Sequence, residues 1–384
     1  MGTATTAGAT QVEITRDPEA VEGLADAWSS LASARENAFV TAEWFAAWRR
    51  NYADGAQPLV GVARSAEGDV EGVLPLVLEG KTIRFAGSGL GDRFGPAAAA
   101  DKEVEVAEAL GSALRAIRAE WSSLVLENVD PEAAWWRELS MAAGCGESPI
   151  LGRGSPLPAI RMRGRSWEEY LASRSRNLRS QLGRRRRGLE RSHDIQVRWS
   201  GEERVNEDMA TLFRLHHARW STREQASSMT RRALGFHTDF AKLAARRRWL
   251  RLCFLEVDGQ PVAGWYGWRI GERFAYYQAG FEPEWADRSV GIVLFAETVR
   301  TAFEEGAATY DMLLGDEHFK QRFADDADAV RTVLIAPRWR PTRLMARAEA
   351  GARSASMALP EELRQSVKAR ARGLLHRLPM ARRR

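Results

Sequence analysis

The chain has little of what marks a secreted, a metal-binding or a membrane-spanning protein. Its only cysteines are Cys145 and Cys253, without a CxxC spacing, so we expect neither a disulfide framework nor a cysteine-bound metal. No apolar run approaches the ~20 residues that cross a bilayer. The first residues, MGTATTAGATQVEITRDPEA, lack the apolar block of a secretory signal. A cytoplasmic protein is therefore expected.

The chain does contain enough apolar residues to build globular cores. Hydrophobic residues make up 45% of its 384 residues, and the 14 tryptophans argue against disorder. A chain of this length suits two domains and a tail.

Positive charge is concentrated in two segments. Residues 161–191 and 341–384 each carry a net charge of +8, whereas the whole chain carries +5, so the remainder is acidic at −11. Basic segments of this kind bind phosphates, nucleic acid or anionic lipid. They also occur as a solvated helix face or a frayed tail, and the charge alone leaves both interpretations open.

Two parts of the chain repeat the same order of predicted elements. Residues 59–89 and 250–280 each read as three strands separated by glycine-containing turns, which predicts an antiparallel meander. A helical stretch and a further apolar strand follow each meander, at about 101–119 and 122–128, and again at about 289–305 and 308–314. The pattern indicates one α/β unit used twice.

Residues 145–158, rich in glycine, serine and proline, mark the boundary between the two units. We expect domains at 10–155 and 156–340, followed by a basic helical tail at 341–384. The second domain should open with one long helix after about residue 166, where Ser166 and Glu169 form a capping box. Two further helices are predicted at about 204–224 and 231–247.

The predicted meander, helix and strand resemble the middle of the GNAT acyltransferase fold. Over about residues 35–335 the chain resembles the tandem-GNAT group that contains CelD-like acetyltransferases and FemABX-like peptidyltransferases. The stretches that carry this resemblance, in order, are FVTAEWFAAWRRNY, IRFAGSGLGDRFGP, WEEYLASRSRNLRSQLGRRRRGLER, LHHARW, YYQAGFEPEWADRSVGIVLFAETV and YDMLLGDEHFKQRFA. The resemblance implies an α/β (α+β) protein of two GNAT-like domains, each a mixed sheet flanked by helices, with the donor site and the chemistry in the second.

The segment RSVGIV resembles the pyrophosphate-binding pattern of the family, Arg/Gln-x-x-Gly-x-Gly/Ala. Arg288 and Gly291 match this pattern, and Val293 departs from it. The resemblance implies that backbone N–H groups at the start of the helix hold the pyrophosphate of acetyl-CoA or another acyl-CoA. The predicted donor-binding residues are Tyr277, Gln278, Arg288, Ser289, Val290, Gly291 and Ile292.

The segment YDMLLGDEHFKQRFADD runs from a buried strand directly into charged residues. An amine must lose a proton before it attacks an acyl carbonyl, and a carboxylate at the strand end can accept that proton. Asp316 is the first choice for this base and Glu317 the second. The resemblance to FemABX-like proteins implies that Phe319 and Lys320 lie at the reacting centre, where Lys320 would stabilise an oxyanion or hold a donor phosphate. The alternative is structural, with Asp316 capping a short helix and Lys320 solvated.

Further residues are candidates for contact with the acceptor, although each also has a structural explanation in a turn or a core. They are Asp92, Phe94, Arg219, Trp220, His237 and Phe319. A metal site is not expected, because His216 and His217 are adjacent on a helix and point apart.

These observations predict an acyltransferase that moves an acetyl or acyl group from acyl-CoA to an amine or hydroxyl of a sugar, an amino acid or a cell-envelope precursor. One alternative is an aminoacyl-tRNA-dependent, FemABX-like peptidyltransferase that binds tRNA through the run from Arg184 to Arg187. A second alternative is a non-catalytic, GNAT-shaped binding protein whose basic tail contacts a membrane peripherally.

Overall fold

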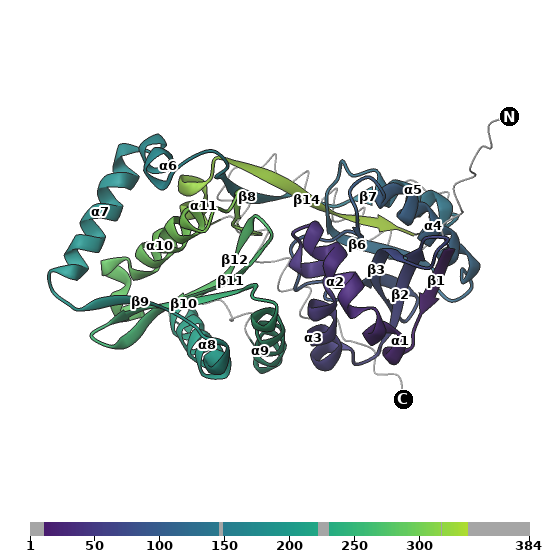
Figure 1. Ribbon diagram of the computed structural model, residues 1–384, viewed down its shortest axis with the longest axis horizontal. Coiled ribbons are helices and arrows are strands. Elements are labelled where there is room, and N and C mark those ends of the chain that lie inside the picture. The colour runs from purple at the N-terminus through teal and green to yellow at the C-terminus, as the bar shows by residue number, and fades with distance from the viewer. Residues whose placement is uncertain (1–10, 146–148, 222–229, 316, 337–384) are drawn as a thin grey trace, which may run out of the picture.

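The computed structural model describes residues 11–145, 149–221, 230–315 and 317–336, except for the side chains of Trp220 and Ser221. The described chain forms two α/β halves side by side, each a mixed sheet with helices packed on it (Figure 1). The predicted tail at 341–384 lies outside the described residues. The mixed α/β class expected from the sequence is confirmed.

In the N-terminal half the predicted meander is present. Strands β2 (Ala56–Arg64), β3 (Val70–Glu79) and β4 (Thr82–Phe85) pair antiparallel, and β6 (Ser123–Val129) lies parallel to β4. At the outer edge, β1 (Gln11–Thr15) pairs with β2. The other elements are α1 (Pro18–Gly23), α2 (Ala25–Ala34), η1 (Ala38–Val40), α3 (Ala42–Tyr52), β5 (Ala97–Ala98), α4 (Glu103–Ala116), α5 (Trp135–Ala142) and β7 (Ile150–Leu151).

The C-terminal half repeats this order. Strands β10 (Leu250–Val257), β11 (Gln260–Ile270) and β12 (Arg273–Phe281) form the second meander, and β13 (Thr309–Asp311) lies parallel to β12. The other elements are β8 (Ser155–Arg161), α6 (Trp167–Ser173), α7 (Arg176–Glu190), β9 (Ile195–Trp199), η2 (Glu202–Arg204), α8 (Val205–Ser221), α9 (Arg231–Arg246), η3 (Pro283–Arg288), α10 (Val290–Glu304), α11 (His318–Phe323) and β14 (Asp326–Ile335). The internal repeat read from the sequence is therefore confirmed.

The single long helix expected after residue 166 is wrong, because the chain breaks it into α6 and α7. The capping box of Ser166 and Glu169 is confirmed at the start of α6. Arg174 is extended, and Ser175 accepts a hydrogen bond from the N–H of Leu178 as the N-cap of α7. The Arg174 side chain donates to the carbonyls of Phe323 and Ala324, which holds the break against the end of α11.

The last strand, β14, contributes to both halves. Its first part pairs with β8 and its second part with β6, so one chain of paired strands runs through the molecule. Figure 1 shows β14 crossing from one half to the other. The predicted boundary near residue 155 thus lies between two halves that β14 connects by pairing with a strand of each.

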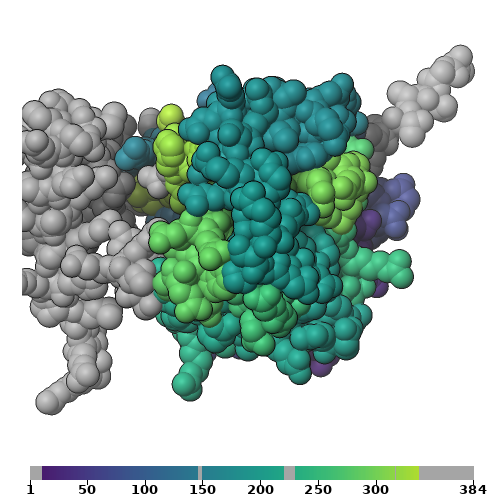
Figure 2. Space-filling view, turned by 90° about the vertical axis from the view of Figure 1, so that its left-hand side faces the viewer, coloured from purple at the N-terminus to yellow at the C-terminus, as the bar shows by residue number. Residues whose placement is uncertain are grey.

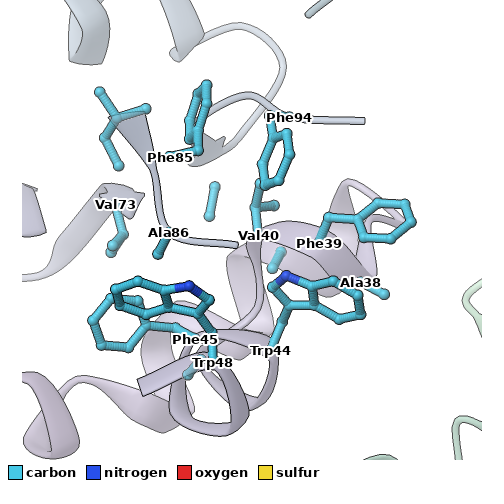
Figure 3. Packing of buried hydrophobic residues seen from close by; sticks show 14 of the residues in the cluster. Ala38, Phe39, Val40, Trp44, Phe45, Trp48, Val73, Phe85, Ala86 and Phe94 are labelled. Carbon is cyan, nitrogen blue, oxygen red and sulfur yellow. The ribbon is translucent and has the colours of Figure 1, made fainter. Parts of the chain in front are cut away.

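A shared aromatic core also joins the halves. Trp44 of α3 is 1% exposed and packs edge-on against Phe236 and Phe240 of α9, with ring centroids 4.7 and 4.9 Å away. Figure 3 shows Trp44 among the buried side chains of α3, with Phe85 and Phe94 on the other side of the cluster. Aromatic pairs of this kind stabilise by about 0.5–1.5 kcal/mol each beyond simple burial, so the halves are packed as one body.

Candidate active site

A cavity of about 170 Å³ lies where β12 ends and the chain enters α10. Its walls are mostly apolar and come from α8, β11, β12, η3, the start of α10 and α11. The lining residues are Arg219, Gly264, Trp265, Tyr276, Ala279, Phe281, Ala286, Ser289, Val290, Gly291, Ile292, Leu294, Phe295 and Phe319. Apolar clefts with a few placed polar groups are the usual form of a small-molecule site.

The first turn of α10 forms one wall of this cavity. Ser289 has a left-handed backbone, with φ of 57°, and its side chain makes no capping hydrogen bond to the helix. The first N–H groups of a helix have no partner within the helix, and the helix dipole favours an anion there. Gly291 leaves space in this wall, because a Cβ at that position would lie only 3.2 Å from the Phe281 ring. This geometry suits a phosphate group.

The predicted donor residues divide into two groups. Ser289, Val290, Gly291 and Ile292 line the cavity, and their binding of a donor stays a prediction. The departure at Val293 does not block it, because Val293 lines a different cavity beneath α7. Arg288 does not line the cavity either; its exposed guanidinium lies 5.6 Å from the centroid of the Trp285 ring.

Strand alternation turns Tyr277 away from the cavity, and a β-bulge does the same for Gln278. Tyr266 pairs with Gln278 and Gly267 with Tyr276, so Tyr277 is the extra residue on β12. After the bulge the alternation of faces is reversed, and Tyr276, Ala279 and Phe281 line the cavity instead. The Tyr277 hydroxyl donates to the carbonyl of Leu90 in the other half, and Gln278 hydrogen-bonds with His216.

Lys320 lies beside this cavity and is almost completely buried, with 3% exposed. Its Nζ donates to the carbonyl of Leu314 at 2.6 Å and pairs with Glu317 at 3.1 Å. It also lies 5.4 Å from the centroid of the Tyr276 ring, which lines the cavity. The proposed solvated lysine is therefore wrong, since this ammonium group is held in the interior. Asp316, the first choice for the base, lies outside the described residues.

Asp92 reaches the same place from the N-terminal half. Its Oδ2 accepts a hydrogen bond from the N–H of Leu314 at 3.1 Å. Burial raises the pKa of the Asp92 carboxyl to about 7, although the Leu314 N–H and the nearby Lys320 ammonium both oppose the rise. Asp92 and Lys320 thus both contact Leu314 at the junction of the halves, through its N–H and its carbonyl.

An ion-pair network around the buried Asp311 holds this junction together. Asp311, 1% exposed at the end of β13, pairs with Arg273 at 3.0 Å and with Arg93 at 3.3 Å. Arg93 also pairs with Asp328 at 2.8 Å. Asp311 accepts a further hydrogen bond from the N–H of Leu313, whose φ is 53°. Because Arg93 follows Asp92 directly, the network fixes the position of the Asp92 carboxyl.

The predicted acceptor residues are dispersed. Arg219 and Phe319 line the cavity. Phe94 stacks on Phe85 with ring centroids 4.8 Å apart, and its 3% exposure makes it a core residue. His237 is also buried, and burial lowers its pKa to about 3, so its imidazole is neutral. The Trp220 side chain lies outside the described part of the chain.

The arginine run at 184–187 does not form one surface. Arg185 donates to the carbonyl of Asp287 at 2.5 Å, and Arg186 pairs with Glu190 and Glu297. Arg184 and Arg187 are exposed.

In the described residues no group of three His, Cys, Asp or Glu side chains is arranged to hold a metal ion. None of the described helices is long and apolar enough to cross a membrane.

Sequence reasoning missed Trp265, Tyr276 and Phe295 as lining residues. Tyr276 could have been found from strand alternation, since it neighbours Tyr277 on the opposite face. The contact of Asp92 with Leu314 has no local signal, because the two residues are brought together only by the packing of the halves.

Comparison with known proteins agrees with this architecture. Residues 176–321 match the family model described as an acetyltransferase (GNAT) domain. No curated protein sequence matches the chain.

Solved structures with a similar fold include FemX, at a TM-score of 0.59 and 12% identity, covering 87% of this chain and 100% of that chain. The C-terminal domain of a protein named as a lysylphosphatidylglycerol synthetase, from Agrobacterium fabrum, has a TM-score of 0.56 and 13% identity over 85% of this chain and 96% of that chain. L-PGS from Bacillus licheniformis has a TM-score of 0.53 and 12% identity over 86% and 95% of the two chains. Such low identities show the fold alone.

The fold is therefore that of a tandem GNAT protein, with two GNAT-like halves. The second half carries a GNAT-like acetyltransferase domain that contains the α10 cavity. Membership of the CelD-like and FemABX-like group in particular stays a prediction.

Proposed function

We propose that the protein transfers an acetyl or other acyl group from acyl-CoA to an amine or hydroxyl of a sugar, an amino acid or a cell-envelope precursor. The observation that carries the proposal is the apolar cavity at the N-terminus of α10. Tyr276 lines this cavity, and Lys320 contacts the Tyr276 ring. The helix terminus suits the diphosphate of the donor, and the buried ammonium of Lys320 beside Tyr276 suits the reaction.

Asp92 is the best candidate for the general base. A base works best when its pKa lies near the operating pH, and a carboxyl with a pKa of about 7 meets that condition. It would accept the proton of the attacking ammonium or hydroxyl group. Glu317, the second choice from the sequence, is less suited, because it forms an ion pair with Lys320.

Lys320 is proposed to stabilise the negative charge that develops on the carbonyl oxygen of the acyl group. A buried ammonium is effective there, because few water molecules screen its charge. The acceptor forms a bond to the acyl carbon, the carbon–sulfur bond breaks, and the thiolate of coenzyme A leaves and takes up a proton.

The test is calorimetry followed by turnover. The full chain should bind acetyl-CoA with micromolar affinity. Lys320→Ala should lower turnover of acetyl-CoA with an amine acceptor by about 100-fold, the range of acid–base and oxyanion effects. Turnover within threefold of wild type would reject the role of Lys320. If neither acetyl-CoA nor longer acyl-CoAs bind, acyl-CoA is rejected as the donor.

An aminoacyl-tRNA donor is the second candidate. It is supported by the fold that the chain shares with FemX and with proteins named for lysylphosphatidylglycerol synthesis. The exposed arginines of α7 are compatible with RNA phosphates. Transfer from an aminoacyl-tRNA without any binding of acyl-CoA would favour this candidate, and binding without any transfer would favour a non-catalytic protein. A cytoplasmic or membrane-peripheral location stays a prediction.

A further inference from the structure

We propose that α7 forms an outer wall of the donor site, and that Arg184 and Arg185, together with Arg322 of α11, bind the phosphate groups of the donor. This inference rests on the proposed acyl-CoA dependence. It assigns a role to a helix that precedes the repeated unit of the C-terminal half.

The position of α7 is the first argument. Arg185 donates to the carbonyl of Asp287 in η3, three residues before α10 begins at Val290. Four residues earlier on the same helix, Gln181 accepts a hydrogen bond from Arg322 of α11 at 2.7 Å. The helix therefore touches both segments that border the cavity, since Ser289 and Phe319 line it. Figure 1 shows α7 outside α10, and Figure 2 shows α6 and α7 in teal across the front of this half.

The size of the cavity is the second argument. Sites that bury a drug-sized ligand measure roughly 300–1,000 Å³, whereas this cavity holds about 170 Å³. It can enclose only the narrow, apolar part of an acyl-CoA. The diphosphate and the phosphorylated ribose must then lie outside it, against whatever borders the start of α10.

The charges at that border are the third argument. Arg184 is exposed, and Arg185 has a buried Nε without a hydrogen-bond partner. Within the described residues neither of them, nor Arg322, forms an ion pair with a carboxylate. Arg186, by contrast, is neutralised by Glu190 and Glu297. Unneutralised guanidinium groups bind phosphates in bidentate geometry, which a helix terminus alone does not provide.

The experiment measures binding of three ligands to the full-length chain by calorimetry. CoA carries all the phosphates, dephospho-CoA lacks the ribose phosphate, and pantetheine lacks every phosphate. The variants are Arg184→Gln, Arg185→Gln and Arg322→Gln. Arg176→Gln, an exposed residue in the first turn of α7, is the matched control.

Each of the three variants should weaken CoA binding about 10-fold, as expected for the loss of one charge-assisted hydrogen bond. Pantetheine binding should stay within twofold of wild type, and the control should bind CoA as wild type does. Arg185→Lys should recover part of the CoA affinity, because it restores the charge without the bidentate geometry. A smaller effect of any variant on dephospho-CoA than on CoA would assign that arginine to the ribose phosphate.

Two results would overturn the inference while leaving the proposed function intact. The first is wild-type affinity for CoA in all three variants. The second is an equal loss of CoA and pantetheine binding, which would mean that the substitutions damage the cavity. A wild-type chain that binds an RNA hairpin and not CoA would instead refute the acyl-CoA donor itself, together with the inference that rests on it.

Discussion

At the scale of single residues, the proposed chemistry depends on two charged residues supplied by different halves. Lys320 is buried near Tyr276 in the C-terminal half, and Asp92 comes from a loop of the N-terminal half. Burial favours the neutral form of a carboxyl, whereas a nearby ammonium favours the charged form. The balance leaves the Asp92 pKa at about 7, where a small change in pH changes its charge.

The first prediction concerns the pH dependence of turnover. If Asp92 is the base, it acts only when ionised, so kcat/KM should rise with pH up to about 7 and then level off. Asp92→Asn should lower kcat by about 100-fold and abolish this rise. A variant that keeps wild-type turnover, or a wild-type profile that is flat between pH 5.5 and 8.5, would contradict the assignment.

The second prediction concerns stability and uses the same variant. The folded-state pKa of Asp92 is raised from 3.8 to about 7, so the folded protein binds the proton more tightly than the unfolded chain. The ionised carboxyl therefore destabilises the fold fully above pH 7, and this cost disappears as pH falls below 4. Asp92→Asn should raise the unfolding free energy at pH 8 more than at pH 4. Glu67→Gln is the control, because Glu67 is exposed.

At the scale of elements, the turn between β13 and α11 places Lys320. Gly315 has φ of 138°, and a Cβ there would lie 2.1 Å from Oε2 of Glu317 and 2.5 Å from Nζ of Lys320. Only glycine adopts this backbone region readily and also leaves room for the ion pair. The strand therefore ends in a conformation that the local sequence dictates.

Gly315→Ala should therefore show how the conformation of this turn affects turnover, apart from any general effect on the fold. We expect turnover to fall by at least 10-fold and the unfolding free energy to drop by about 1–3 kcal/mol, the usual cost of a strained backbone residue. Gly259→Ala is a suitable control, because Gly259 also has a positive φ, of 76°, but meets nothing within 4 Å. Equal turnover in the two variants would contradict the role of the turn at Gly315 in placing Lys320.

The elements also show how far the sequence can predict the structure. The two meanders and the helix after each follow from short-range periodicity, which the sequence displays directly. The break at Arg174 was not predicted, because Arg174 itself bonds to distant carbonyls near the end of α11. The misplacement of Gln278 has a similar origin, since the bulge at Tyr277 depends on the pairing of β12 with β11.

At the scale of the whole molecule, the C-terminal half alone lines the cavity, whereas Asp92 joins the proposed site only because the halves are packed against each other. Asp92 reaches the Leu314 N–H across the junction, and Asp311 and Arg93 pair across the same junction. The sequence predicted both halves but not the contacts between them, because contacts between residues more than 200 positions apart produce no periodic pattern in the sequence. The buried network should therefore control activity and stability together.

Arg93→Ala tests this coupling. The substitution leaves Asp311 buried with Arg273 as its remaining partner and deprives Asp328 of one of its two arginines. Because each carboxylate keeps one arginine partner, the loss should be smaller than for an uncompensated buried charge, about 1–3 kcal/mol. Turnover should fall as well, since the loop that carries Asp92 loses its anchor to β13.

Arg84→Ala is the matched control for this variant. Arg84 pairs with Glu79 and Glu127 within the N-terminal half, on a more exposed surface. Surface pairs contribute about 0–1 kcal/mol, so this variant should unfold near the wild-type denaturant concentration and keep its turnover. If Arg93→Ala loses stability but retains full turnover, the network holds the halves together without positioning Asp92. If it loses turnover at temperatures where it is fully folded, the junction itself sets the geometry of the reaction.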